Sequence, residues 1–108
     1  MLTLTGTTTA NSSGKAELYW TCPPGEQWTI NQAFVSSSST NPSSCTMLVG
    51  NITSGALVSV TATSGGNNDT ADGTPLVLDA GQSLVFKWEG ASAGATCSAS
   101  ALYCRTIL

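Results

Sequence analysis

Residues 16–30 read AELYWTCPPGEQWTI and hold two strand patterns separated by a turn. Apolar side chains stand at every second position of the first pattern, at Ala16, Leu18, Trp20 and Cys22. The alternation is repeated after the turn by Trp28, Ile30 and Phe34. A period of two is typical of strands that bury one face. Since Pro23 and Pro24 can neither continue a helix nor donate to a sheet ladder, they separate the two strands.

Strand patterns continue through the rest of the chain. They fall at residues 45–49, 57–62, 76–78, 84–88 and 95–107, with turn-forming residues such as Gly, Asn and Pro between them. Short strands separated by turn residues at this spacing are typical of sandwiches. With seven to eight strands expected and no amphipathic helix, the sequence predicts an all-β fold: an antiparallel β-sandwich, jelly-roll-like or immunoglobulin-like.

The chain divides into a short first segment and one domain. Its 108 residues suit a single core, which we place at residues 15–108. Residues 1–14 differ, because large apolar side chains give way to Thr, Ser and Asn after Leu4. This segment is either the first strand of the sandwich or an N-terminal arm that adds to the sheet edge of a neighbour. On the arm hypothesis, the residues that bind the neighbour are Leu2, Thr3, Leu4, Thr5, Thr7, Thr8 and Thr9.

The sequence contains few side chains that could act in catalysis or bind a metal ion. The chain has no His, three basic and six acidic residues, but 15 Ser and 16 Thr. Proton transfer near neutral pH relies mostly on His or on tuned carboxylates, so we expect no enzyme, no cofactor and no metal site. A net charge of −3 supplies no basic patch for nucleic acid, and no apolar run is long enough for a membrane. Few charges instead permit copies to pack closely together.

Four cysteines, Cys22, Cys45, Cys97 and Cys104, leave several states open. If residues 97–104 form one strand, Cys97 and Cys104 lie about 23 Å apart. The Cα atoms of a disulfide lie within about 7 Å, so these two cysteines do not pair with each other. Each therefore pairs with Cys22 or Cys45, or the cysteines remain buried thiols in a reducing compartment.

The aromatic residues divide by parity. Trp20, Trp28 and Trp88 share the parity of aliphatic neighbours and are expected in the core. Tyr19 and Tyr103 are assigned the opposite parity and are candidates for a surface contact. Residues 65–73, GGNNDTADG, are expected to form a flexible hairpin tip rather than a calcium loop. Exposed aromatics together with this Asn- and Asp-rich loop would suit a carbohydrate-binding module, which is the alternative function.

Several motifs resemble those of a known group of proteins. They are CPPGEQWTI at residues 22–30, CTMLVG at 45–50, DTADGTP at 69–75, LDAGQSL at 78–84 and WEGA at 88–91. In these turn-and-strand patterns the chain resembles the small β-sandwich virion proteins of tailed bacteriophages, which decorate the capsid or sit on tail structures. The resemblance runs over residues 15–104.

The resemblance implies a capsid decoration protein on the virion surface. Such a protein, made in the host cytoplasm, binds the lattice of major capsid protein, often as a homo-oligomer, a trimer at local three-fold positions. It would stabilise the shell by bridging adjacent subunits, with residues 2–9 making the contact. A tail-associated structural protein would have the same composition, so the sequence leaves capsid and tail locations open.

Overall fold

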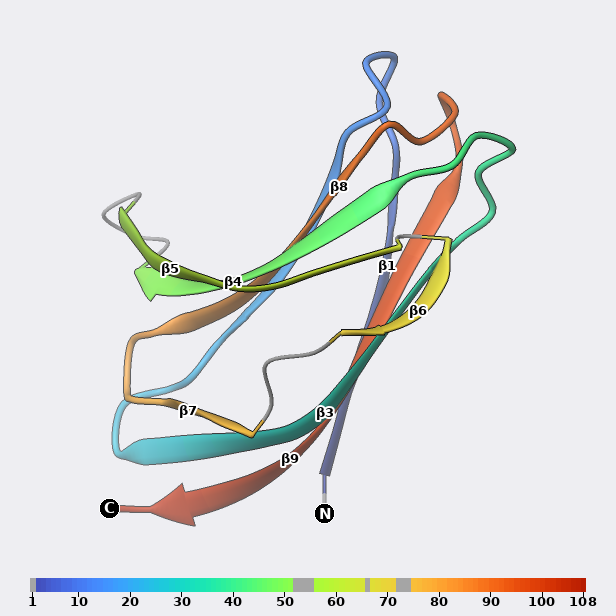
Figure 1. Ribbon diagram of the computed structural model, residues 1–108. Coiled ribbons are helices and arrows are strands. Elements are labelled where there is room, and N and C mark those ends of the chain that lie inside the picture. Colours follow the sequence, from blue (N-terminus) through green and yellow to red (C-terminus); the bar gives the residue numbers. More distant parts are fainter. Residues whose placement is uncertain (1, 52–55, 66, 72–74) are drawn as a thin grey trace.

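The computed structural model describes residues 2–51, 56–65, 67–71 and 75–108, and it confirms the antiparallel β-sandwich (Figure 1). The strands are β1 (Leu2–Thr9), β2 (Ala16–Thr21), β3 (Glu26–Ser37), β4 (Ser44–Asn51), β5 (Ala56–Gly65), β6 (Asn68–Ala71), β7 (Leu76–Leu78), β8 (Ser83–Glu89) and β9 (Thr96–Ile107). Within the described residues, no helix is long and apolar enough to cross a membrane.

Two antiparallel sheets form the layers of the sandwich. Sheet A has the order β1-β9-β3-β6, with β7 also paired to β3, and sheet B has the order β2-β8-β4-β5. The short strands β6 and β7 pair with different parts of β3, residues 33–36 and 28–30, so together they fill one position in the sheet. The described part of the chain thus has nine strands in eight positions, where seven to eight strands were expected.

The strand order separates the two forms of sandwich that the sequence leaves open. In an immunoglobulin domain the first two strands pair within one sheet. Here β1 lies in sheet A and β2 in sheet B, and the chain continues to alternate, with β3 in sheet A and β4 in sheet B. The order is therefore jelly-roll-like.

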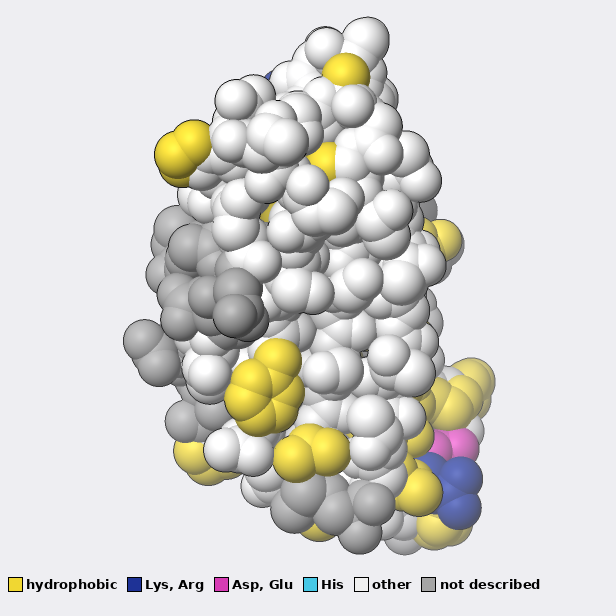
Figure 2. All heavy atoms as spheres, turned by 90° about the vertical axis from the view of Figure 1, so that its right-hand side faces the viewer, with side chains coloured by type: hydrophobic (Ala, Val, Ile, Leu, Met, Phe, Trp, Pro, Cys, Tyr) yellow, Lys and Arg dark blue, Asp and Glu magenta, His cyan; other side chains and the backbone are white. Residues whose placement is uncertain are grey.

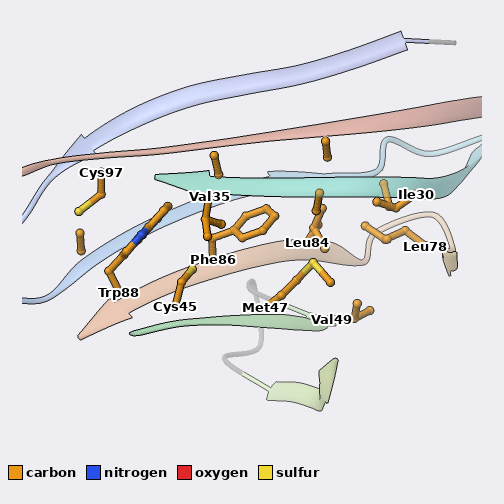
Figure 3. Close-up of a cluster of buried hydrophobic side chains, with 14 of the residues drawn as sticks. Ile30, Val35, Cys45, Met47, Val49, Leu78, Leu84, Phe86, Trp88 and Cys97 are labelled. Atoms are coloured by element: carbon orange, nitrogen blue, oxygen red, sulfur yellow. The ribbon is translucent and has the colours of Figure 1, made fainter. Parts of the chain in front are cut away.

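The core lies between the two sheets (Figure 3). Ile30 and Val35 enter it from β3, and Leu84, Phe86 and Trp88 enter it from β8. These three residues of β8 have no solvent exposure, as predicted for the core-facing positions of residues 84–88. Removal of these large apolar side chains from water supplies the main driving force for folding.

The tryptophans occupy the centre and the rim of this core. Trp28 and Trp88 are buried as predicted, whereas Trp20 is only partly buried and packs against the margin of the core. Its ring lies against Gly6 of β1, where an added Cβ would come within 3.2 Å of the Trp20 Cζ2 atom. The absence of a side chain at Gly6 therefore allows Trp20 to close the side of the sandwich between β1 and β2.

One extra residue in β3 overturns the expected position of Phe34. The pairing of β3 with β9 shifts register between Ile30 and Gln32, so that Asn31 is left over. A bulge of one residue reverses the alternation beyond it. Val35 is consequently buried, and the Phe34 side chain is 39% exposed on the opposite face. The prediction that Phe34 continues the core face of the preceding residues is wrong.

Part of the segment expected to be a flexible hairpin tip is a strand. Asn68–Ala71 form β6 along β3, while residues 66, 72 and 73 lie outside the described part of the chain. The Asn67 side chain makes four hydrogen bonds. Its Oδ1 accepts bonds from the Ser43 N–H (2.7 Å) and hydroxyl (2.6 Å), and its Nδ2 donates to the carbonyls of Ser39 and Asn41. These bonds tie the Ser-rich turn before β4 to the start of β6.

Candidate interaction face

The outer face of sheet A carries the side chains that alternate with the core residues. From β1 come Thr3, Thr5, Thr7 and Thr9, from β9 come Thr96, Ser98, Ser100 and Leu102, and from β3 come Gln32, Phe34 and Ser36. We call these residues the hydroxyl face, because most of them are Ser or Thr. Figure 2 shows this side of the molecule: uncharged polar side chains and backbone cover most of it, and charged side chains gather at the lower right.

Phe34 of β3 is the large aromatic residue of the hydroxyl face. It pairs with Ser100 of β9 on one side and with Thr70 of β6 on the other. Residues opposite each other on antiparallel strands have Cβ atoms about 5 Å apart, so hydroxyl-bearing residues flank the ring directly. A shallow hollow of about 230 Å³ lies beside it and is also lined by Thr5, Ser98 and Ser100. The face therefore offers an aromatic anchor surrounded by hydrogen-bonding groups.

The ion pairs of the described residues lie beside the hydroxyl face rather than on it. Arg105 and Glu26 form an ion pair of 3.7 Å at one end of sheet A. Lys87 and Glu17 form a second pair of 3.7 Å on sheet B, beside a groove of about 410 Å³ between the edges of the two sheets. None of the residues that make up the hydroxyl face is ionisable, so a partner can cover it without burying an unpaired charge.

The residues predicted to bind a neighbour all lie in β1, which pairs along its length with β9 of the same chain. Residues 2–9 are thus the first strand of sheet A. The residues that project onto the hydroxyl face are Thr3, Thr5, Thr7 and Thr9. Leu4 and Thr8 have the opposite parity and point toward the core side, and Leu2 lies opposite Tyr103 with 44% of its surface exposed. The predicted set is therefore split between two faces.

The two tyrosines have different surroundings. Tyr19 is 52% exposed on the outer face of sheet B. Tyr103 instead packs against the margin of the core, with its ring centroid 4.8 Å from that of Trp28. Tyr103 packs there because it has the parity of the buried Ala99 and Ala101 of β9, so the prediction that it has the opposite parity is wrong.

All four cysteines carry free thiols, so none of the possible disulfides is present. Cys45 of β4 and Cys97 of β9 enter the core from opposite sheets, at the end where Trp88 lies (Figure 3). Burial raises the pKa of the Cys45 thiol to about 12, and the nearby Cys97 adds to the increase. Burial also raises the pKa of Cys22, with a further contribution from the Glu26 carboxylate. These buried thiols therefore behave as small apolar groups, whereas Cys104 is exposed.

Phe34 was not predicted as a surface residue, although the sequence contains a signal for it. Ala33 and Val35 begin a second apolar alternation that is out of phase with Trp28 and Ile30. The polar pair at residues 31 and 32 marks the change. A change of phase within one strand indicates a bulge, which places Phe34 on the outer face.

The hydroxyl face, which includes the exposed Phe34 ring and has the described ion pairs beside it, is the candidate binding surface of the chain. No family model matches the sequence, and no curated protein matches it.

Proposed function

We propose that this chain is a bacteriophage virion structural protein, a capsid decoration protein that binds and stabilises the lattice of major capsid protein. The observation that carries the proposal is the hydroxyl face, a surface whose residues are uncharged and include the exposed Phe34 ring. The jelly-roll-like strand order supports the proposal, because this architecture recurs in viral capsid domains. The motif resemblance over residues 15–104 points the same way.

In the proposed mechanism, the shell covers the hydroxyl face. Phe34 enters an apolar pocket on the shell, while the surrounding hydroxyls exchange bonds with water for bonds with shell peptide groups. Because the face has no ionised group that must lose its hydration, the cost of desolvation is small. Interfaces of about 1,000 Å² or less then suffice, since a lattice offers many equivalent sites to an oligomer.

Stabilisation follows when one oligomer touches two adjacent shell subunits. The added contacts bury surface across the joint between these subunits. Pressure from packaged DNA must break the added contacts before the subunits separate. A tail-associated structural protein would use the same face, and immunogold labelling of virions under the electron microscope distinguishes the two locations.

Phe34→Ala tests the role of the hydroxyl face. Loss of an aromatic anchor costs about 2 kcal/mol, which corresponds to about a 30-fold weaker Kd. Tyr19→Ala is the matched control, because Tyr19 is also exposed but lies on the outer face of sheet B. Co-sedimentation with empty shells of the major capsid protein encoded by the same genome measures the binding. Weaker binding of Phe34→Ala alone supports the proposal, and unchanged binding of this variant contradicts it.

A carbohydrate-binding module is the second candidate, and the exposure of Tyr19 favours it. The ring is 52% exposed, and the exposed side chains of Glu17 and Thr21 lie on the same face of β2. An exposed aromatic ring flanked by polar groups suits stacking on a sugar. A glycan array probed with the wild type and Tyr19→Ala tests this function: a glycan that binds only the wild type would support it.

A further inference from the structure

β1 presents an unprotected sheet edge. It is the last strand of sheet A on its side and pairs only with β9 in the described part of the chain. Soluble proteins protect such edges with charges, prolines, bulges or short strands, because the free backbone groups attract other strands. β1 is eight residues long, contains neither a charged residue nor a proline, and pairs with β9 without a register shift. It has none of these protections.

The backbone groups that face the open edge can be identified from one hydrogen bond. The Ala10 N–H donates to the Ala95 carbonyl (2.8 Å), one step beyond the last pair of the β1–β9 register. Residues of an antiparallel strand direct their N–H and C=O alternately to the two sides. Even-numbered residues of β1 therefore bond to β9. The N–H and C=O groups of the odd-numbered residues, Thr3, Thr5, Thr7 and Thr9, point to the open edge.

We infer that β1 pairs with β1 of a second copy of this chain, antiparallel and across a two-fold axis. The other described edges are poorer partners for an eight-residue strand. β6 and β7 have four and three residues, and β2 has six and is followed closely by two prolines. β5 is longer, but its pairing with β4 shifts register twice, and bulged strands do not present a straight edge. Only a second β1 matches in length and regularity.

The faces of the two copies are compatible in this arrangement. If Thr5 lies opposite Thr5 of the second copy, then Thr3 lies opposite Thr7, and the outer faces form one surface. Cross-strand Thr pairs of this kind stabilise antiparallel sheets. No like charges meet, because residues 2–9 carry none. Sheet A then continues through both copies and presents two Phe34 rings on one side.

Pairing of identical edges closes at two copies and leaves no β1 edge free. The proposed dimer therefore differs from the trimer that the resemblance implies. It does not rest on the proposed function, since it concerns the isolated chain. If both hold, the two Phe34 rings bind the shell together, and the dimer gains avidity.

Sedimentation equilibrium of the purified full chain tests the inference. We expect a species of twice the 10.9 kDa chain mass. Thr7→Pro removes an N–H donor at the open edge and leaves the bonds to β9 intact, so it should fold and weaken dimerisation at least 10-fold. Thr7→Val keeps the donor and should dimerise like the wild type. A wild type that is monomeric or trimeric, or a Thr7→Pro variant that dimerises like the wild type, overturns the inference.

Hydrogen exchange on the wild type provides a measurement that does not depend on the folding of Thr7→Pro. In the dimer the amides of Thr5 and Thr7 are bonded across the two-fold axis, so their exchange should slow as protein concentration rises. Amides of the even-numbered residues, bonded to β9 in every state, serve as the internal control. Exchange at Thr5 and Thr7 that is fast at all concentrations contradicts the inference.

Discussion

The outer faces of the two sheets differ in what covers them. In sheet A, β9 alternates between buried and more exposed residues, and Val77 of β7 is 50% exposed on the outer side. In sheet B, four consecutive residues of β8, from Ser83 to Phe86, are buried, and Val85 on the outer side has no exposure. Strict alternation marks a face left to solvent, whereas continuous burial marks a strand enclosed on both sides. The outer face of sheet A is thus open to partners along β9 and β7, whereas that of sheet B is covered at Val85 of β8 and leaves Tyr19 of β2 exposed.

Substitution of an aromatic residue on the inner face of the sandwich should reduce stability more than substitution of one on the outer face. Trp88→Ala removes a fully buried side chain and should lower the free energy of unfolding by about 3–5 kcal/mol, a large part of the total for a small domain. Phe34→Ala should lower it less, by about 1 kcal/mol, because the residue is 39% exposed. Urea denaturation followed by tryptophan fluorescence and circular dichroism measures both. A large loss with Phe34→Ala would mean that this ring belongs to the core.

The same substitution at two valines, one on the outer face of each sheet, allows a direct comparison of the two faces. Val85→Ala removes two buried methyl groups and should lower the free energy of unfolding by about 2 kcal/mol. Val77→Ala makes the same chemical change on the outer face of sheet A, where the side chain is 50% exposed, and should cost under about 0.5 kcal/mol. Equal losses in urea denaturation would show that the two faces are covered alike in solution.

Alkaline pH should destabilise the protein through Cys45. The unfolded thiol titrates near the ordinary pKa of 9.0, whereas burial raises the folded pKa to about 12. As pH rises above 9, the unfolded chain loses this proton and the folded chain keeps it, so stability falls. One pH unit above the unfolded pKa, the loss from this thiol is about 1.4 kcal/mol.

Two alanine variants isolate this effect in urea denaturation at pH 7 and pH 10. The free energy of unfolding of Cys45→Ala should fall less between the two pH values than that of the wild type. The difference should equal the loss due to the Cys45 thiol. Cys104→Ala, at an exposed position on sheet A, should behave like the wild type. If stability depends on pH equally in the wild type and in Cys45→Ala, the raised pKa of the Cys45 thiol in the folded state is contradicted.

Much of the sandwich could be predicted from local patterns. The expected strands at residues 76–78 and 84–88 match β7 and β8 closely, because alternation and turn residues are properties of short segments. The strand β6 was missed, since Asn68–Ala71 carry no such alternation and depend on pairing with β3. Bulge placement was missed as well. It is set by the register of β3 against β9, residues that lie far apart in the sequence.

The hydroxyl face, too, could be predicted from the sequence only in part. Its lack of charge is evident from a composition with three basic and six acidic residues, and the Thr residues of β1 could be named in advance. Phe34 could not be placed by counting from Trp28, because one extra residue reversed the parity. The role of residues 2–9 also stayed open, since an edge strand and an arm have the same sequence pattern.

The sequence by itself determined the class of fold and the uncharged character of the surface, because periodicity and composition are carried by each segment alone. The tertiary structure decided which sheet each strand joins, which side of β3 carries Phe34, and that β1 lies at an open edge. These features depend on hydrogen-bond register between distant segments. A shift of one residue in that register exchanges the buried and the exposed faces of a strand.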